Sequence, residues 1–401
     1  MSHIINKELR YGALNYKPIM VNIARAKGIY MYDTNNKRYF DYLAGYSSVN
    51  QGHCNKDIID KAVKQMRTLT LTSRAFTNNK LGEYFEYMTT TLGYDKILPT
   101  NTGVEAGETA VKLARLWGYK YKNVPENEAI VCFARNNFWG RSIAAISSSN
   151  DPKCYQNFGP YARGFKLIEY NNIEALEYLF STNNNIVAYM VEPIQGEAGI
   201  IIPDNNYLMS VKKLCEKYNV LLIADEVQTG LGRTGKLMAC DHDNVKPDIL
   251  LLGKALSAGL MPISCVLAND NVMKYMGENM HGSTFGGNPL SAVVAQASVD
   301  YTLTHKLHKN SHQMGKYFRN ELNRIKESYS FIKDIRGKGL MNAIQCGNEK
   351  YAKQLVEALR NNNILTKTTH ETTLRMTPPL IINKKQLNES LSLIEKAFKE
   401  M

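Results

Sequence analysis

Short apolar runs alternate with polar, helix-like stretches through the middle of the chain, from about residue 129 to residue 270. Strands that are apolar almost throughout are typical of a largely parallel sheet whose two faces are both covered by helices. The pattern therefore predicts an α/β fold with a mostly parallel sheet between layers of helices. The expected strands are residues 130–133, 187–191, 220–224, 249–252 and 263–267.

Helical spacing of apolar residues predicts helices on both sides of this region. One helix is expected at residues 104–122, directly after the pair Thr102-Gly103. After about Asn288 the pattern changes to amphipathic helices mixed with shorter strand-like runs, which predicts a smaller α+β domain. Its expected helices are residues 290–303, 311–326, 351–361 and 385–398, and its expected strands lie near residues 341–345 and 373–376.

The overall composition is that of an ordinary folded protein, with 401 residues of which 44% are hydrophobic and 21% charged. No run approaches the roughly 20 apolar residues that a membrane span needs, so no membrane partner is expected. The formal net charge is +12, but the lysines are spread along the chain without a basic tail or a nucleic-acid-binding signature. A basic nucleic-acid-binding protein is therefore kept only as the alternative from a different class.

The N-terminus and the cysteines bear on the compartment and on metal binding. Residues 1–10 lack the apolar core of a signal peptide and contain an early acidic residue, which predicts a cytoplasmic protein. The seven cysteines form no CxxC pair and the eight histidines show no ligand spacing, so neither disulfides nor a metal is expected. Cys154 lies in a polar, loop-like stretch, and both an exposed redox thiol and an inert thiol remain open for it.

Two neighbouring strands of the predicted sheet are followed by ionisable residues. Run 220–224 leads into Asp225 and Glu226, and run 249–252 leads through Gly253 into Lys254. In open α/β sheets, ligands bind beyond the carboxyl ends of the strands, where one of two adjacent acids can point into a cleft. A partly desolvated lysine has a lowered pKa that suits Schiff-base chemistry. The acid and the lysine together predict a catalytic site at this edge.

A phosphate site is expected at the start of the helix that follows Thr102-Gly103. The glycine turn exposes the first backbone N–H groups of the helix, which attract phosphate. No GxxxxGK[ST] motif occurs, so a nucleotide triphosphate is not implied. The hydroxyls of Ser283 and Thr284, with the turn at residues 286–289, are candidates to close on the same phosphate.

Residues 230–235 match the pattern GxGxxG, which occurs in dinucleotide-binding proteins. The residues that follow, 236–247, are polar and do not have the pattern of a helix that packs on the sheet. We therefore do not interpret the glycines as a dinucleotide-binding motif. A flexible loop on the substrate side is the expectation for this segment.

The lysine, the strand-end acid and the helix-end phosphate site together resemble the class III aminotransferases of fold type I. The resemblance extends from about Tyr11 to the C-terminus, and within that family it is greatest to the ornithine aminotransferases. It implies a pyridoxal-5'-phosphate-dependent transaminase with a large cofactor-binding domain at residues 46–288 and a C-terminal small domain at 289–401. Residues 1–45 would contribute to the small domain and to the active site. The resemblance to the family rests on the sequence blocks 48–53, 70–76, 101–112, 137–141, 191–199, 224–230, 252–256 and 281–290.

The resemblance also implies roles around the cofactor ring. Lys254 would form the Schiff base, and Asp225 would keep the pyridine nitrogen protonated so that the ring can absorb the electrons of a carbanion. Lys254, once freed, would move the proton between the substrate carbon and the cofactor. Gln228 would lie near the phenolic oxygen of the ring, and Phe138 would stack on the ring.

For the phosphate, the resemblance implies donors from two subunits. Gly103 and Val104 would bind it from one chain, whereas Ser283 and Thr284 would reach the phosphate of the other subunit. An obligate homodimer is therefore expected.

Substrate recognition, by the same resemblance, rests on Tyr16, Tyr46, Arg141, Glu197 and Arg375. Tyr16 and Arg141 would hold the α-amino and α-carboxylate groups of L-ornithine, so that its δ-amine reaches the cofactor. Glu197 would shield Arg375 until 2-oxoglutarate arrives, since arginine suits carboxylates. The implied products are L-glutamate 5-semialdehyde and L-glutamate, in proline and arginine metabolism.

Two positions depart from this pattern. Gly232 and Phe285 are more similar to the acetylornithine aminotransferases of the same family. Transamination of acetylornithine or 4-aminobutyrate is therefore the alternative within the family. Tyr16 favours free ornithine, because it can bond an α-amine that acetylation would block.

Overall fold

The computed structural model describes residues 3–401, and a seven-stranded sheet forms its larger part. Strands β5, β6, β7, β8 and β9 pair in parallel, whereas β10 is antiparallel to both of its neighbours. The prediction of a mostly parallel sheet is confirmed, and each predicted run forms a strand whose ends shift by at most one residue. In sheet order the strands are β4 (Lys96–Thr100), β10 (Ser264–Ala268), β9 (Ile249–Leu252), β8 (Leu221–Asp225), β7 (Ile186–Val191), β5 (Ile130–Ala134) and β6 (Phe165–Ile168).

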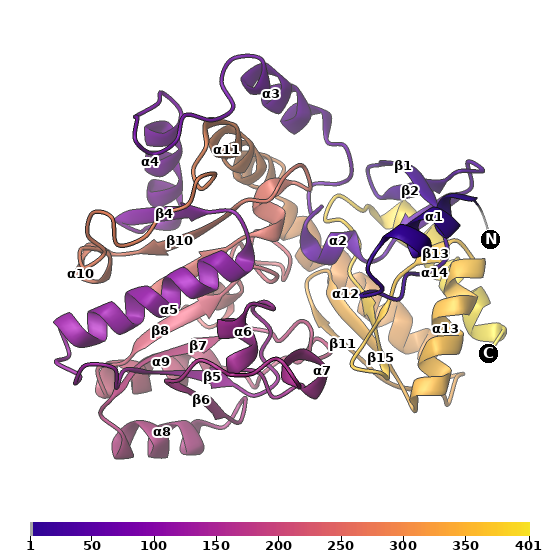
Figure 1. The fold of residues 1–401 in the computed structure, drawn as a ribbon. Helices are drawn as coiled ribbons and strands as arrows, with labels where there is room; N and C mark the ends of the chain where they lie inside the picture. Colours follow the sequence, from indigo (N-terminus) through magenta and orange to yellow (C-terminus); the bar gives the residue numbers. More distant parts are fainter. Residues whose placement is uncertain (1–2) are drawn as a thin grey trace.

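Helices cover both faces of this sheet, as Figure 1 shows. Side chains of β8 alternate between the faces: Leu221 and Ile223 pack in the cluster that contains α5, and Leu222 and Ala224 pack in the cluster of the opposite face. The result is a three-layer core in which the central strands are buried on both sides. The helices of this part are α3 (Lys56–Met66), α4 (Leu81–Leu92), α5 (Gly103–Lys120), α6 (Ile143–Ser147), α7 (Pro152–Tyr155), α8 (Ile173–Thr182), α9 (Tyr207–Lys217), α10 (Asp270–Met273) and α11 (Pro289–Thr304), with the 3-10 turns η1 (Ala239–His242) and η2 (Lys254–Ser257).

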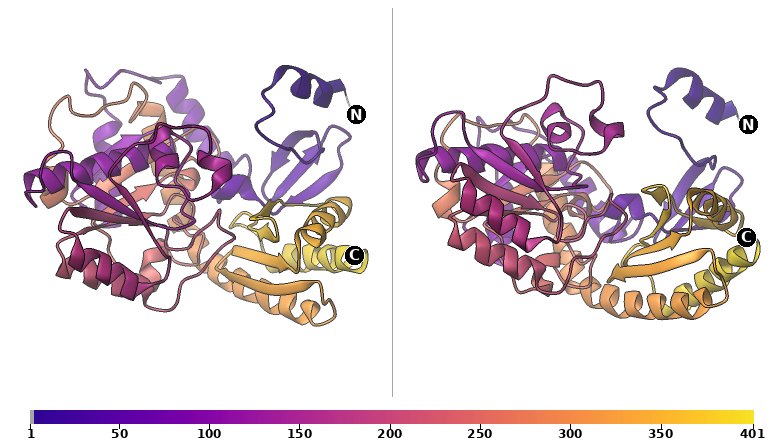
Figure 2. Two further views of the ribbon diagram at one scale, coloured as in Figure 1. Left: turned by 60° about the horizontal axis from the view of Figure 1, so that its bottom comes forward. Right: turned by 90° about the horizontal axis from the view of Figure 1, so that it is seen from below.

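A second core joins the two ends of the chain. Ile29 and Phe40 of the N-terminal segment pack there with buried side chains from residues 307–398, and β3 pairs in parallel with β13. Figures 1 and 2 show these indigo and yellow segments side by side, next to the larger part. The strands of this core form the orders β1-β2-β3-β13 and β11-β12-β15-β14. Its elements are β1 (Ile23–Lys27), β2 (Tyr30–Asp33), β3 (Arg38–Asp41), β11 (Ile332–Lys338), β12 (Met341–Cys346), β13 (Ile364–Leu365), β14 (Thr368–Thr369), β15 (Thr373–Met376), α12 (Leu307–Lys326), α13 (Glu349–Asn361) and α14 (Lys384–Lys399).

The change from one core to the other falls after α11. The buried side chains of α11 belong to the core of the large sheet, and the second core begins with Leu307. Residues 289–304 thus pack with the larger part, although they follow the boundary expected at residue 289. The remaining helices, α1 (His3–Tyr11) and α2 (Ala44–Ser47), lie in the N-terminal segment. Within residues 3–401, no helix has the length and apolar character required to cross a membrane.

Residues 230–235 are buried throughout and connect the two cores. Arg233 is fully buried, and its Nη1 donates to the carbonyl oxygens of Leu340 (2.9 Å) and Pro378 (2.7 Å). Its Nη2 donates to Oδ1 of Asn50 at 2.5 Å. The expectation of a flexible, substrate-side loop is therefore wrong, because the glycine turns wrap a guanidinium that links the two parts of the molecule.

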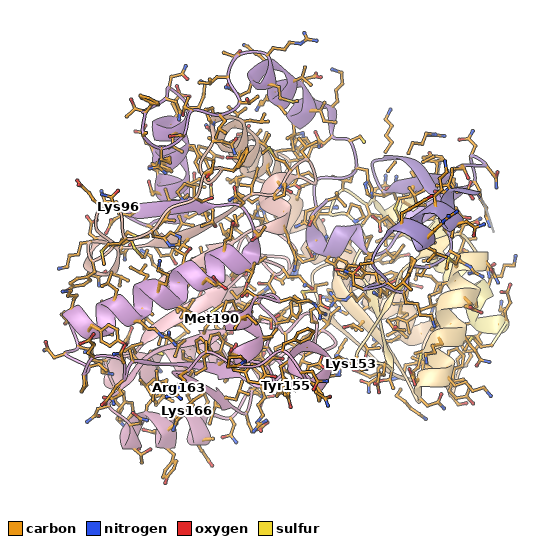
Figure 3. The ribbon with its side chains drawn as sticks, in the orientation of Figure 1. Lys96, Lys153, Tyr155, Arg163, Lys166 and Met190 are labelled. Carbon is orange, nitrogen blue, oxygen red and sulfur yellow. The ribbon has the colours of Figure 1, made fainter. Side chains whose placement is uncertain are left out.

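Helix α7 forms a second, weaker contact between the parts. Figure 3 labels Lys153 at the edge of the larger part, and its Nζ lies 3.0 Å from Oε1 of Glu371. Both side chains are exposed, so this ion pair contributes little. The neighbouring Cys154 is buried, and its thiol donates to Asp151 at 3.3 Å. Burial raises the pKa of the Cys154 thiol, so the structure favours the inert thiol over the exposed redox thiol.

Replacing Arg233 with methionine should lower the free energy of unfolding by about 3–5 kcal/mol, because the change leaves buried acceptors without a donor. Denaturant unfolding measures this loss. The matched control is Arg324→Met, since Arg324 is exposed and pairs with Glu321 at the surface. The control should change stability by less than about 0.5 kcal/mol. Equal unfolding midpoints for the two variants would contradict the role given to Arg233.

Candidate active site

The ends of the parallel strands β8 and β9 place an acid and a lysine at one pocket. Asp225 is the last residue of β8, stands opposite Leu251 of β9 and is 6% exposed. Lys254 follows β9 by two residues and begins η2 with a φ of +40°. The pocket has a volume of about 230 Å³. It is lined by Gly103, Val104, Phe138, Trp139, Gly140, Glu192, Asp225, Val227, Gln228 and Lys254.

Burial shifts the pKa values of both ionisable groups toward their neutral forms. Desolvation raises the pKa of Asp225 to about 6, although the N–H of Val227 donates to its Oδ1 at 3.0 Å. Within residues 3–401, no ion pair includes Asp225. Desolvation lowers the pKa of Lys254, and the carboxylates of Glu197 and Asp225 oppose the shift. A lysine closer to its neutral amine is a better nucleophile and a better proton acceptor.

Glu192 is a further acid of this pocket that the sequence analysis missed. It is buried and accepts the N–H groups of Phe138 (3.0 Å) and Gly196 (3.1 Å). Desolvation and then the charge of Asp225 raise the pKa of Glu192 to about 8. Glu192 directly follows β7 as Asp225 ends β8, so the strand-end signal that led to Asp225 would also have found it.

The start of α5 leaves two backbone donors without acceptors. The N–H of Glu105 is capped by Oγ1 of Thr102 at 3.3 Å, and the N–H of Ala106 bonds to the carbonyl of Thr102 at 3.1 Å. Neither the N–H of Gly103 nor that of Val104 has an acceptor within residues 3–401. Two free donors at the end of an 18-residue helix suit a phosphate group.

A buried arginine from the second core lies beside this pocket. Arg375 of β15 is 1% exposed, and its Nη1 donates to Oε1 of Gln228 at 2.7 Å. Its Nη2 lies 2.7 Å from Oε1 of Glu197, and its Cζ lies 5.3 Å from the ring centroid of Tyr46. The structure therefore brings Tyr46, Glu197 and Arg375 together and connects them to the pocket through Gln228.

Two predicted substrate residues lie farther out. The guanidinium carbon of Arg141 is 5.7 Å from the ring centroid of Phe138, and Arg141 is exposed. Tyr16 is 70% exposed, with Nζ of Lys367 at 5.8 Å from its ring centroid. Neither residue lines the pocket.

Ser283 and Thr284 are outside the pocket of their own chain. Oγ of Ser283 accepts from Nδ2 of Asn101 at 2.8 Å, and Thr284 is exposed. Asn101 directly precedes the cap of α5, so Ser283 lies near the phosphate-binding end of this helix without lining the pocket.

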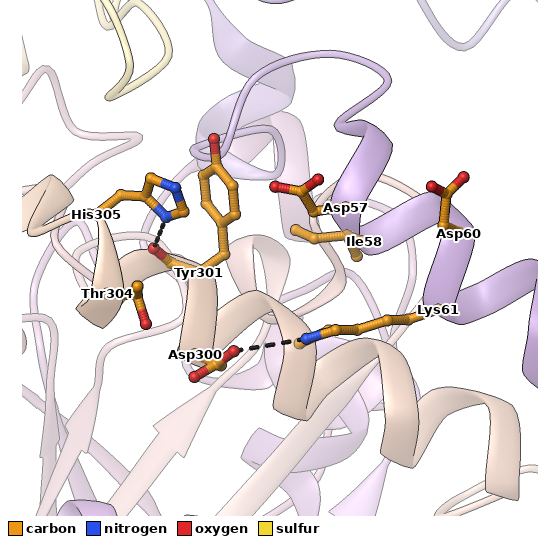
Figure 4. A pocket seen from close by; sticks show the side chains of 9 residues that line it. Asp57, Ile58, Asp60, Lys61, Asp300, Tyr301, Thr304 and His305 are labelled. Carbon is orange, nitrogen blue, oxygen red and sulfur yellow. Dashed lines mark hydrogen bonds and ion pairs between the residues drawn. The ribbon is translucent and has the colours of Figure 1, made fainter.

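A second hollow between α3 and α11 has a different character (Figure 4). Two of its polar side chains already have partners: Lys61 pairs with Asp300 at 3.5 Å, and Nδ1 of His305 lies 3.0 Å from the carbonyl oxygen of Tyr301. It lies on helices and contains neither a strand-end acid nor a buried lysine. The chemistry therefore belongs to the pocket of Asp225 and Lys254.

Comparisons with known proteins show the family and the similar structures of this chain. The family model "Aminotransferase class-III" matches residues 11–398. The mitochondrial ornithine aminotransferase of Drosophila melanogaster is 51% identical over 395 residues, which cover 98% of this chain and 91% of that protein. The solved structure of the ornithine aminotransferase from Toxoplasma gondii ME49 is similar with a TM-score of 0.97 at 43% identity, covering 99% of this chain and 94% of that one. The acetylornithine aminotransferase from Elizabethkingia anophelis is similar with a TM-score of 0.92 at 45% identity, covering 99% and 98% of the two chains.

The chain belongs to the class-III aminotransferase family. It is a transaminase that depends on pyridoxal 5'-phosphate, as the resemblance of its motifs predicted. The residues of the pocket fit this cofactor, because free N–H donors, a buried carboxylate and a desolvated lysine surround one cavity.

Gly140 lines the pocket beside Val104, one of the two expected phosphate donors, and a substitution of Gly140 tests whether the phosphate binds there. Its φ is +148°, and a Cβ there would lie 2.4 Å from Cγ2 of Val104. Gly140→Ala should therefore displace Val104 and weaken cofactor binding by about 10-fold or more, since overpacking costs about 1–3 kcal/mol. The control is Gly82→Ala in α4, where an added Cβ would have no atom within 4 Å apart from its chain neighbours and the backbone of its own helix. Titration of each apoenzyme with pyridoxal 5'-phosphate gives the Kd, and an unchanged Kd for Gly140→Ala would refute the assignment.

Proposed function

We propose that this chain transfers the δ-amino group of L-ornithine to 2-oxoglutarate, giving L-glutamate 5-semialdehyde and L-glutamate. The observation that carries the proposal is the ion pair of Arg375 with Glu197 at 2.7 Å beside the pocket. An arginine occupied by a carboxylate does not offer its bidentate face to the α-carboxylate of an incoming amino acid. A donor that reacts through a distal amine is therefore favoured first. The ornithine aminotransferases named above support the same choice.

In this proposal, bound pyridoxal 5'-phosphate supplies an electron sink for the carbon that bears the reacting amine. Asp225 would keep a proton on the ring nitrogen, since it is a buried carboxylate that forms no ion pair within residues 3–401 and therefore favours a cationic partner. Lys254 would take a proton from the substrate carbon and pass it to the cofactor, and its lowered pKa favours the first of these two transfers. Phe138 and Gln228 line the pocket, where Phe138 would stack on the ring and Gln228 would lie near its phenolic oxygen.

Arg141 and Tyr16, which lie farther out than the pocket residues, would orient ornithine. Arg141 is exposed and forms no ion pair with any residue of the range 3–401, so its guanidinium is free for an α-carboxylate. The exposed hydroxyl of Tyr16 would bond the α-amine. With both α-groups held at the entrance, the δ-amine is the group that reaches Lys254.

Glu197 would act as the gate between the two half-reactions. Its side chain is 32% exposed and can turn toward solvent, whereas its carbonyl oxygen accepts from Oγ1 of Thr369 at 2.5 Å. The backbone thus stays in place while the carboxylate leaves Arg375. The released guanidinium then binds a carboxylate of 2-oxoglutarate.

The proposal includes a homodimer in which Ser283 and Thr284 bind the phosphate of the partner subunit. The exposure of Thr284 and Phe285 in the single chain supports this assignment. The cytoplasmic location and the absence of a nucleic-acid partner stay predictions from the sequence.

Acetylornithine is the second candidate donor, because an acetylornithine aminotransferase is among the similar structures. Gly232 and Phe285 are the two positions that are more similar to the acetylornithine aminotransferases, and for Gly232 the structure gives another explanation. Gly232 has a φ of +93° in the buried turn beside Arg233, and a Cβ there would face Leu380 and His308. Gly232 is thus a residue of the link between the cores and does not bear on the donor.

Labelled ornithine tests the regiochemistry. Ornithine labelled with ¹⁵N at the δ-position, mixed with 2-oxoglutarate and the holoenzyme, should give ¹⁵N-glutamate, because the amino nitrogen is passed to the oxo acid. Ornithine labelled only at the α-position should give unlabelled glutamate. Mass spectrometry of glutamate separates the two results, and label from the α-position alone would exclude the proposed reaction.

Removing the gate should change the donor preference. In Glu197→Ala the guanidinium of Arg375 is free from the start, so kcat/KM for donors that react through an α-amine should rise by about 10-fold, equal to ~1.4 kcal/mol. The control is Glu371→Ala, which removes an exposed carboxylate from the nearby segment between β14 and β15. An unchanged ratio of α- to δ-label transfer in Glu197→Ala would rule out the gate.

A further inference from the structure

Tyr46 lies in α2 (Ala44–Ser47), which is a short turn with an uncommon, left-handed backbone. Ala44, Gly45, Tyr46 and Ser47 all have φ between +49° and +77°, in the left-handed region. Each non-glycine residue in this region costs about 1–2 kcal/mol. Such a turn persists only where surrounding contacts hold it, and here it places the ring of Tyr46 5.3 Å from the guanidinium carbon of Arg375.

The carboxylate of Asp41 holds the start of this turn. Asp41 is 2% exposed, and its Oδ1 accepts the N–H groups of Leu43 and Ala44, both at 2.8 Å. Hydrogen bonds to a charged acceptor are the stronger kind. On the other side, the N–H of Thr377 donates to the carbonyl oxygen of Tyr42 at 2.9 Å, which ties the turn to the strand of Arg375.

His53 fixes the second oxygen of Asp41. Its Nε2 lies 2.7 Å from Oδ2 of Asp41, and its side chain is largely buried. The backbone of His53 exchanges two hydrogen bonds with Gly28, at 2.9 and 2.8 Å, so the ring has a fixed anchor in the N-terminal strands. Asp41 therefore cannot rotate away from the turn without losing its bond to His53.

We propose that Asp41 and His53 are positioning residues that hold Tyr46 against Arg375 and so set the affinity of the site for the carboxylate of the 2-oxo acid. Tyr46 covers one face of the guanidinium, and a cation–π contact of this kind contributes about 0.5–2 kcal/mol. We call the pair of Asp41 and His53 the clamp. Without the clamp, the turn relaxes, water reaches the guanidinium of Arg375, and the preorganisation of Arg375 is lost. The amine half-reaction, which uses Tyr16 and Arg141 in the proposed function, does not depend on this clamp.

The test compares His53→Ala with His53→Gln, whose amide nitrogen can still donate to Asp41. Glutarate, a dicarboxylate without a reacting carbonyl, serves as the probe for Arg375, and calorimetry on enzyme loaded with pyridoxamine 5'-phosphate gives its Kd. His53→Ala should raise this Kd by about 10-fold, and His53→Gln should keep it within about threefold of the wild type. The control His305→Ala removes an exposed histidine that directly follows α11 and should leave the Kd unchanged.

Single-turnover rates distinguish a positioning role of His53 from a general loss of active structure in the variant. In His53→Ala the rate constant with 2-oxoglutarate at low concentration should fall by about 10-fold, and the rate constant with ornithine should stay within about twofold. Equal losses in both half-reactions, an unchanged glutarate Kd, or a His53→Gln variant as weak as His53→Ala would overturn the proposal. The proposal rests on the proposed function for the donor and for the binding of the oxo-acid carboxylate by Arg375. A wild type that does not react with ornithine would reject the proposed donor, whereas the Kd values for glutarate would still test the role of Asp41 and His53.

Discussion

The structure depends on one constraint, which is that an acid and a lysine stay partly dehydrated at the ends of two adjacent parallel strands. Charged groups are costly to bury, and Asp225 and Lys254 respond with pKa values shifted toward their neutral forms. The strands β8 and β9 keep the two groups at one cavity, because their own side chains are buried on both faces of the sheet. A cationic ring nitrogen beside Asp225 and a carbonyl carbon beside Lys254 are the partners that such a pocket favours.

Residues 41–53 connect this pocket to the second core. Asn50 accepts from Arg233, and Nε2 of Gln51 donates to the carbonyl oxygen of Ala255, next to Lys254, at 3.2 Å. In the same segment Tyr46 lies over Arg375. One short stretch of chain thus contacts the buried interdomain arginine, the turn of the lysine and the arginine assigned to the oxo acid. The geometry of the second half-reaction is therefore coupled to the way in which the two cores pack.

Much of the fold could be predicted from apolar periodicity, because strands such as 249–252 are buried on both faces and contain no polar residue to obscure the pattern. The direction of β10 could not be predicted, since a fully apolar run has the same composition in a parallel and in an antiparallel strand. For residues 230–235, the glycines led to the expectation of a flexible loop, whereas the burial of Arg233 depends on acceptors of Asn50, Leu340 and Pro378, which lie far away in the sequence. Glu192 directly follows β7 as Asp225 ends β8, so the same strand-end pattern predicts it, whereas the contacts of Asp41 with His53 are encoded by no local motif.

The most direct test of the account is the visible absorbance of the purified holoenzyme before and after addition of ornithine, without any 2-oxo acid. A site in which Lys254 and Asp225 accept the free diamine as donor predicts that ornithine alone removes the visible band of the cofactor, and that 2-oxoglutarate then restores it. Acetylornithine and 4-aminobutyrate, added separately, should leave the band almost unchanged. A band that acetylornithine removes and ornithine does not would contradict the assignment of the donor, and a protein that binds no pyridoxal 5'-phosphate would contradict the account of the pocket itself.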